Sequence, residues 1–153
     1  MSDDLAALLA RTIESLRSAG IEPEHLAERR PARRLGPIQL AEKLVPAGRA
    51  WRLGELLVTD QGVLLATGIV TRAVEPRQFA ANKSPSEEAR RELQRAAVRG
   101  GFPTGAAVNV DSREIETDRD AAGAMTVALP DAVVNLEHYL ADRVRFAITP
   151  GWD

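Results

Sequence analysis

The chain of 153 residues contains no cysteine, two histidines and few aromatic side chains, which make up 4% of the sequence. Without cysteine, the chain cannot form disulfide bonds, use a thiolate nucleophile or bind a metal through sulfur. The two histidines, His25 and His138, are far apart in the sequence, and neither has metal-ligand spacing such as HExxH. We therefore expect no metal site and no cofactor.

Long hydrophobic runs and a strong net charge of one sign are also absent. No apolar run approaches the length of a membrane span, and residues 1–16 are acidic where a signal peptide would be basic. The formal net charge of −2 gives no overall attraction to nucleic acid or to an anionic membrane. All basic residues except Lys43 and Lys83 are arginine, which indicates a GC-rich coding sequence. The sequence therefore predicts a cytoplasmic protein with no membrane attachment.

The N-terminal part of the chain predicts helices followed by a basic connection. Apolar residues recur at helical spacing over residues 3–19, which predicts an amphipathic helix. Its apolar positions are Leu5, Leu8, Leu9, Ile13 and Leu16. A short second helix is predicted from Pro23 to Arg29, and the proline-containing run RRPARR at 29–34 is predicted to be a connecting segment. We expect an N-terminal helical arm and basic linker over 1–35 and a single α+β domain over 36–153.

The body of the chain predicts a curved antiparallel sheet around a central hairpin at 50–74. Two β-prone runs flank a Thr-Asp-Gln-Gly turn there. A turn that pairs Val58 with Val63 sets the register of this hairpin. In that register Trp51 lies opposite Val70. Shorter strands are predicted at 106–110, 113–116, 125–129 and 132–134, and either a strand or a helix at 38–45.

Two further helices are predicted from their capping residues, and they complete the packing against the sheet. Ser84 suits the N-cap of a helix over 84–99, and Pro85 suits its first position. Asn135 suits the N-cap of a helix over about 136–144, which carries apolar residues that can pack back on the sheet.

The start of the predicted helix 84–99 is the first candidate site. Backbone N–H groups at a helix N-terminus attract anions, and Lys83 and Ser84 add a positive charge and a hydroxyl. Arg72, on an otherwise apolar strand face, points to the same chemistry. The alternative is that Ser84 only caps the helix and Lys83 is solvated, because no glycine-rich phosphate loop precedes this helix.

Arginines along the same helix are the second candidate. Arg91, Arg95 and Arg99 share one helical face, and arginine forks match phosphate oxygens. Glutamates spaced three or four residues earlier can pair with them instead, and aromatic residues for base stacking are missing nearby. The RRPARR run is a stronger positive patch, but three glutamates within 22–28 dilute its field. Nucleic acid is therefore not a favoured partner.

His138 and the acidic segment 111–120 are the remaining candidates for chemistry. A general acid–base histidine needs a hydrogen-bond partner and a cleft, and the sequence indicates neither for His138. The acidic segment lacks the glycine and the final glutamate of a calcium loop, so it predicts an exposed hairpin tip. Neither GxSxG nor SxxK occurs in the chain. The sequence thus identifies no catalytic residue and leaves open whether the chain catalyses a reaction.

One long string of residues resembles a known group of proteins. WRLGELLVTDQGVLLATGIVTRAVEP, followed by KSP, RRELQRAAVRGGFP and VNVD, resembles a family of small uncharacterised proteins from GC-rich bacteria. Some members carry a glutaminase-like label, but this chain lacks the Ser-x-x-Lys pair that serine-dependent glutaminases need. The resemblance, which spans 48–110, implies no activity. Among the shared positions, packing alone does not explain Arg72, Arg91, Arg99 and Asn109, and we expect a pocket near them.

These observations favour a soluble α+β protein that acts as a non-catalytic interaction or oligomeric module. Its N-terminal helix would contact a second copy of the chain, in a homo-oligomer, or a protein partner. The alternative is a small-molecule or anion-binding protein, which includes enzymes, with a site near the start of helix 84–99. The residues predicted for that site are Arg72, Lys83, Ser84, Arg91, Arg99 and Asn109.

Overall fold

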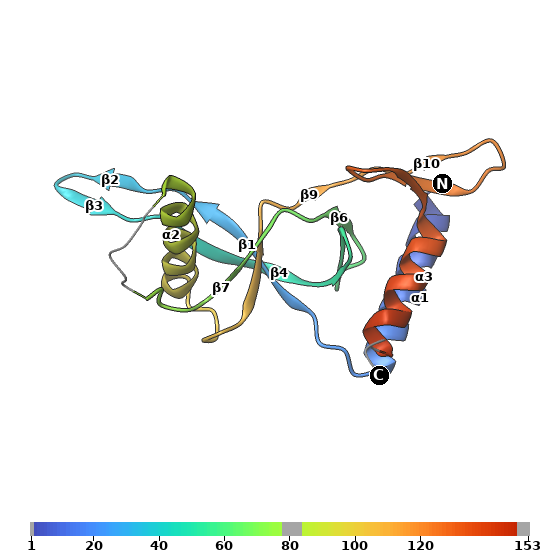
Figure 1. Cartoon of the computed structure of the whole chain (residues 1–153), viewed down its shortest axis with the longest axis horizontal. Coiled ribbons are helices and arrows are strands. Elements are labelled where there is room, and N and C mark those ends of the chain that lie inside the picture. The colour runs from blue at the N-terminus through green and yellow to red at the C-terminus, as the bar shows by residue number, and fades with distance from the viewer. Residues whose placement is uncertain (1, 78–83, 150–153) are drawn as a thin grey trace. The chain divides into compact units, whose positions relative to one another are not determined.

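The computed structural model describes residues 2–77 and 84–149, which form three helices and twelve strands (Figure 1). The strands pair mostly antiparallel, which confirms the predicted α+β fold with an N-terminal helix. The chain divides into two compact units. Unit 1 comprises Met1–Pro23, Ala50–Thr67 and Arg113–Asp153, and unit 2 comprises Glu24–Arg49 and Gly68–Ser112. The domain boundary predicted after residue 35 stays a prediction.

Unit 1 contains two helices and the antiparallel strands between them. Its elements are α1 (Ser2–Ser18), the second half of β4 (Lys43–Leu53), β5 (Leu56–Thr59), β6 (Leu64–Ala66), β9 (Arg113–Glu114), β10 (Asp118–Arg119), β11 (Met125–Ala128), β12 (Val133–Asn135) and α3 (Leu136–Ile148). The strands β4, β5, β6 and β9 pair in that order. A separate three-stranded sheet has the order β10-β11-β12.

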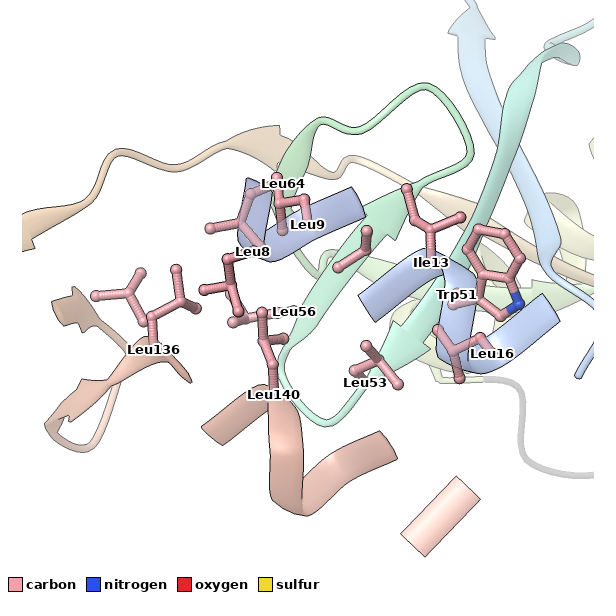
Figure 2. Packing of buried hydrophobic residues seen from close by; sticks show 12 residues of the cluster. Leu8, Leu9, Ile13, Leu16, Trp51, Leu53, Leu56, Leu64, Leu136 and Leu140 are labelled. Atoms are coloured by element: carbon pink, nitrogen blue, oxygen red, sulfur yellow. The ribbon is translucent and has the colours of Figure 1, made fainter. Parts of the chain in front are cut away.

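The core of unit 1 forms where α1 and α3 pack with β4, β5 and β6 (Figure 2). The predicted apolar face of α1 is confirmed, because its spacing of three or four residues places four side chains inward. These buried side chains are Leu8, Leu9, Ile13 and Leu16. They meet Leu56 and Leu140, and the Trp51 indole N–H donates to the Ile21 carbonyl over 2.8 Å. Since a fully buried leucine contributes about 1.5–3 kcal/mol, α1 is an integral part of this core.

Unit 2 is built on three neighbouring strands that α2 covers on one face. Its elements are β1 (Glu24–Arg30), β2 (Arg33–Leu35), β3 (Ile38–Leu40), the first half of β4, β7 (Ile69–Arg72), α2 (Pro85–Arg99) and β8 (Ala107–Val110). β8 pairs antiparallel with β7 and parallel with β1, and β1 also neighbours β4. The buried Leu93, Ala96 and Ala97 of α2 pack against Val108 and Val110 of β8.

The capping residues located the other two helices correctly. The Ser84 hydroxyl accepts a hydrogen bond from the Glu87 N–H, and the Asn135 side chain accepts one from the His138 N–H. α3 continues to Ile148, beyond its predicted end. No helix in the described parts of the chain is long and apolar enough to span a membrane.

The prediction of a helix from Pro23 to Arg29 is wrong, because this segment forms β1. Parallel pairing places Leu26 beside Asn109, and this long-range partner cannot be read from local spacing. The RRPARR run is also not an irregular connection, since β2 begins within it at Arg33. The ambiguous segment 38–45 contains the end of one hairpin, β3, and the start of β4.

The predicted register of the central hairpin is also wrong. Val58 pairs with Leu64 instead of Val63, and Trp51 pairs with Val58 instead of Val70. A tight turn at Gly54, whose φ of 66° favours glycine, divides the expected first strand into β4 and β5 and pairs Trp51 with Val58. The shift at Val58 comes from the turn that follows it, which Thr59 and Val63 close by hydrogen bonds. The expected second strand is likewise divided into β6 and β7.

Candidate functional site

The start of α2 is occupied by its own capping interactions. The Ser84 hydroxyl accepts from the Glu87 N–H over 3.2 Å, and the Ser84 and Ser86 hydroxyls are 3.2 Å apart. Lys83, which the sequence assigned to this site, lies outside the described residues. In the described part of this site, Ser84 therefore serves as a cap, and a ligand role for it stays a prediction.

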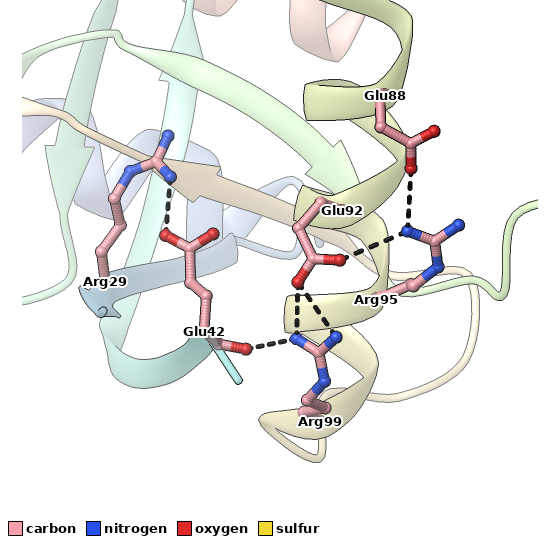
Figure 3. A network of polar contacts seen from close by, with 6 residues as sticks. All are labelled: Arg29, Glu42, Glu88, Glu92, Arg95 and Arg99. Carbon is pink, nitrogen blue, oxygen red and sulfur yellow. Dashed lines mark hydrogen bonds and ion pairs between the residues drawn. The ribbon is translucent and has the colours of Figure 1, made fainter. Parts of the chain in front are cut away.

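The arginines of α2 pair with glutamates of the same helix (Figure 3). Arg95 lies 3.3 Å from both Glu88 and Glu92, and Arg99 lies 3.0 Å from Glu92. Arg99 also donates to the Glu42 carbonyl. Burial alone would raise the pKa of Glu92, but hydrogen bonds and charges from Arg99 and Arg95 lower it. These arginines are largely neutralised within the chain.

Arg91 is the most buried arginine of this row. Its guanidinium lies 3.7 Å from Glu87, and its side chain is 16% exposed. The Nη1 atom of Arg91 is buried without a hydrogen-bond partner among the described residues. An ion pair at this distance satisfies the charge of Arg91 only in part.

Asn109 and Arg72 lie on the strands that α2 covers, but on the opposite face. Asn109 alternates with Val108 and Val110, whose side chains pack towards α2, so its side chain points away from the helix. Asn109 pairs with Val70 of β7, and paired residues point to the same face of a sheet. Arg72 shares that face, because it lies two residues after Val70 on the same strand. The predicted site residues are therefore divided between two faces of unit 2.

The contacts of Asn109 and Arg72 are made to the backbone and to one carboxylate. Asn109 Nδ2 donates to Glu24 Oε1 over 3.0 Å and to the His25 carbonyl over 3.1 Å. Its Oδ1 is buried without a partner in the described parts of the chain. Arg72 is exposed and donates to the Gly105 carbonyl over 2.9 Å. The contacts of Asn109 hold β8 to the start of β1, and that of Arg72 holds the end of β7 to the segment before β8.

Sequence reasoning missed an ion-pair network around Arg29. Its Nε and Nη2 donate to the two oxygens of Asp111 over 2.8 and 2.9 Å, and its Nη1 donates to Glu42 over 3.0 Å. The hydrogen bonds that Arg29 donates to Asp111 lower the pKa of Asp111 and raise the pKa of Arg29. Asp111 also has a φ of 61°, in the left-handed region that aspartate tolerates better than most residues. No local pattern links positions 82 residues apart.

The strands β2 and β3 form a second feature that the sequence did not predict, which we call the basic hairpin (residues 30–41). Its arginines are Arg30, Arg33 and Arg34, and it contains no acidic residue. All three are exposed, and among the residues that the structure describes their side chains have no hydrogen-bond or ion-pair partner. The turn at Gly36 and Pro37 matches a two-residue hairpin loop, since Gly36 has the positive φ of 62° that its first position needs.

Three surface hollows lie in unit 1, which contains none of the predicted site residues. One of about 290 Å³ lies between α1 and α3 and is lined by Leu8, Leu140 and Val144. His138 is exposed on α3. In the described ranges, no three His, Cys, Asp or Glu side chains are grouped as a metal site would need.

Comparisons with protein-family models, curated proteins and solved structures found no match for this chain. The resemblance to small proteins from GC-rich bacteria therefore stays a prediction.

Proposed function

We propose that this chain is an interaction module that binds a polyanionic partner through the basic hairpin. One observation carries the proposal. Arg30, Arg33 and Arg34 are exposed on one hairpin, and none is paired with another side chain among the described residues. Because each arginine can bind a phosphate or sulfate through a two-pronged hydrogen bond, the hairpin has three free sites for anionic groups.

The acidic residues near this hairpin contact partners other than its arginines. Glu24, one of the glutamates expected to dilute its charge, accepts a hydrogen bond from Asn109. Glu42 pairs with Arg29, which also binds Asp111. Glu42 and Asp111 thus both pair with Arg29, while the arginines of the hairpin have no such partners among the described residues.

The functions predicted from the sequence have less support than this one. Contact with a second copy or a protein partner through the apolar face of α1 conflicts with the burial of Leu9 and Leu16 in the core of unit 1. An anion site at the start of α2 has to compete with the Ser84 cap and with the pairing of Arg91 and Glu87. A homo-oligomeric state and a cytoplasmic location stay proposals.

Retention on immobilised heparin, a sulfated polyanion, tests the proposal. The hairpin variant carries Arg30→Ala, Arg33→Ala and Arg34→Ala. We expect it to elute at clearly lower salt than the wild type, because the three contacts to sulfate are lost.

A matched control removes the same charge elsewhere. The control variant changes three exposed arginines that already pair with acids to alanine, namely Arg11, Arg90 and Arg145. We expect it to elute close to the wild type. Equal elution of the wild type and the hairpin variant would show that the hairpin is not the binding surface. Far-UV circular dichroism verifies that both variants are folded.

A further inference from the structure

The tip of the basic hairpin carries apolar side chains that are more than half exposed. Leu35 and Ile38 are opposite each other in the strand register, and they are 58% and 56% exposed. The Gly36–Pro37 turn joins them, so both lie at the end of the hairpin that β2 and β3 form. Figure 1 shows this hairpin. Leucine, isoleucine and proline are among the residues that minor-groove proteins insert between base pairs.

The arginines lie behind this tip and point to both faces of the ribbon. Successive residues of a strand alternate in direction, so Arg33 and Arg34 project from opposite faces. Arg34 is paired in register with Gln39, and Arg33 with Leu40. A ribbon with cations on both faces matches a groove that has a phosphate backbone along each wall.

The reach of the hairpin tip matches the depth of the minor groove, and the kink that insertion causes widens this groove, about 6 Å across in B-form DNA, enough to admit the two strands. Two strand steps separate Arg33 from Leu35, which gives about 7 Å at about 3.3 Å per residue. The minor groove of B-form DNA is about 7.5 Å deep. When the tip reaches the floor of the groove, Arg33 is therefore level with the phosphates at its edge.

We propose that the basic hairpin binds the minor groove of double-stranded DNA, inserts its apolar tip between base pairs and kinks the duplex. The inference rests on the proposed function, because it identifies the polyanion that the hairpin binds. It accounts for Leu35, Pro37 and Ile38 as well as for the arginines. Arg30, Arg33 and Arg34 bind phosphates on both sides of the opened groove.

An anionic membrane is the other partner that a basic hairpin with an apolar tip suggests, and the composition argues against it. Residues 30–41 contain no tryptophan, tyrosine or phenylalanine, the residues that anchor proteins at membrane interfaces. Leu35 and Ile38 offer less apolar surface than one myristoyl chain, which itself gives only marginal membrane binding.

Salt dependence of DNA binding tests the contacts of the arginines. Fluorescence anisotropy with the full chain and a labelled duplex of about 20 base pairs gives the dissociation constant at several NaCl concentrations. Three phosphate contacts predict a slope of about −2.7 in log affinity against log salt, and hence about a 40-fold loss of affinity from about 50 to about 200 mM. The hairpin variant should lose most of this slope, and the control variant should keep it.

A variant of the tip tests insertion separately from charge. Leu35→Ala with Ile38→Ala leaves every arginine in place, so its salt slope should equal that of the wild type. The wild type should bind a duplex with a central mismatch at least about tenfold more tightly than a matched duplex, because a mismatch lowers the cost of unstacking. It should also shorten the end-to-end distance of the DNA in energy-transfer measurements. The tip variant should show neither effect.

Three results would overturn the inference: equal affinity for matched and mismatched duplexes, equal or tighter binding to single-stranded DNA, or binding to phosphatidylserine vesicles but not to DNA. Retention on heparin without binding to duplex DNA would refute DNA as the partner and leave the proposed function standing. A wild-type protein that neither is retained on heparin nor binds duplex DNA would refute the proposed function as well.

Discussion

The ion pair between Arg29 and Asp111 leads to a prediction that separates a backbone effect from a charge effect. Asp111 accepts two hydrogen bonds from Arg29 and also has the left-handed φ of 61°. Asparagine tolerates this conformation about as well as aspartate, whereas alanine does not. Asp111→Asn therefore removes the ion pair alone, and Asp111→Ala removes the ion pair and strains the backbone.

The structure sets the expected magnitudes. The side chains of Arg29 and Asp111 are 36% and 42% exposed, so solvent screens their attraction. For a two-pronged pair at this exposure we expect about 1 kcal/mol. Left-handed backbone costs an alanine roughly 1 kcal/mol more. Asp111→Asn should thus lower the free energy of unfolding by about 1 kcal/mol and Asp111→Ala by about 2 kcal/mol.

Urea unfolding followed by far-UV circular dichroism measures both variants, with Asp131→Asn, an exposed aspartate, as control. Hydrogen bonds from Arg29 lower the pKa of Asp111 in the folded state. The pair therefore stabilises fully above the ordinary aspartate pKa of about 3.9, and this stability is lost as the pH falls through the lower folded-state pKa. The difference between wild type and Asp111→Asn should shrink accordingly in acid. Equal destabilisation by asparagine and alanine would refute the backbone argument, and a neutral Asp111→Asn would refute the charge argument.

Three further predictions concern other positions. Gly54→Ala should lower the melting temperature of unit 1 by several degrees, because its Cβ would overlap the Tyr139 hydroxyl and the backbone has a positive φ; an unchanged melting curve would contradict this. Burial, with the nearby charge of Arg49, lowers the pKa of His25, so the free energy of unfolding of the wild type should fall as the pH drops below 6.5. His25→Gln should remove that fall when stability is measured by urea titration at each pH. Ser84→Ala should lower the stability of α2 by about 1 kcal/mol, because it removes the N-cap, whereas Ser84→Asp should keep the cap and the stability. Amide hydrogen exchange in the first turn of α2 measures the difference.

The helices were predictable because their signals are local. Ser84 and Asn135 accept the capping hydrogen bonds that their positions suggested, and the spacing of the apolar residues of α1 placed them in a core. The pairing of Trp51 was not predictable, because the turn at Gly54 divides one apolar run into two strands. Apolar residues on both sides of such a turn give no periodicity that marks it.

The candidate site was less predictable than the fold. The prolines of the basic run suggested a connection, yet Gly36–Pro37 between Leu35 and Ile38 fits a two-residue hairpin turn with glycine in first position. That dipeptide is the one local signal that could have revealed the hairpin. Which arginines remain unpaired depended on Asp111, far away in the sequence, and no spacing rule predicts such a partner.

The division of unit 1 into separate chain segments has a consequence for its synthesis. Leu16 and Leu136 belong to one core, although 120 residues separate them. At about 5–20 residues per second, the ribosome needs on the order of ten seconds to make the intervening chain. The nascent chain presents the leucines of α1 without α3 throughout that interval, and every strand of unit 2 is synthesised before α3. A chaperone that binds nascent apolar helices would thus find its target at the start of this chain, and unit 2 would complete its fold before unit 1.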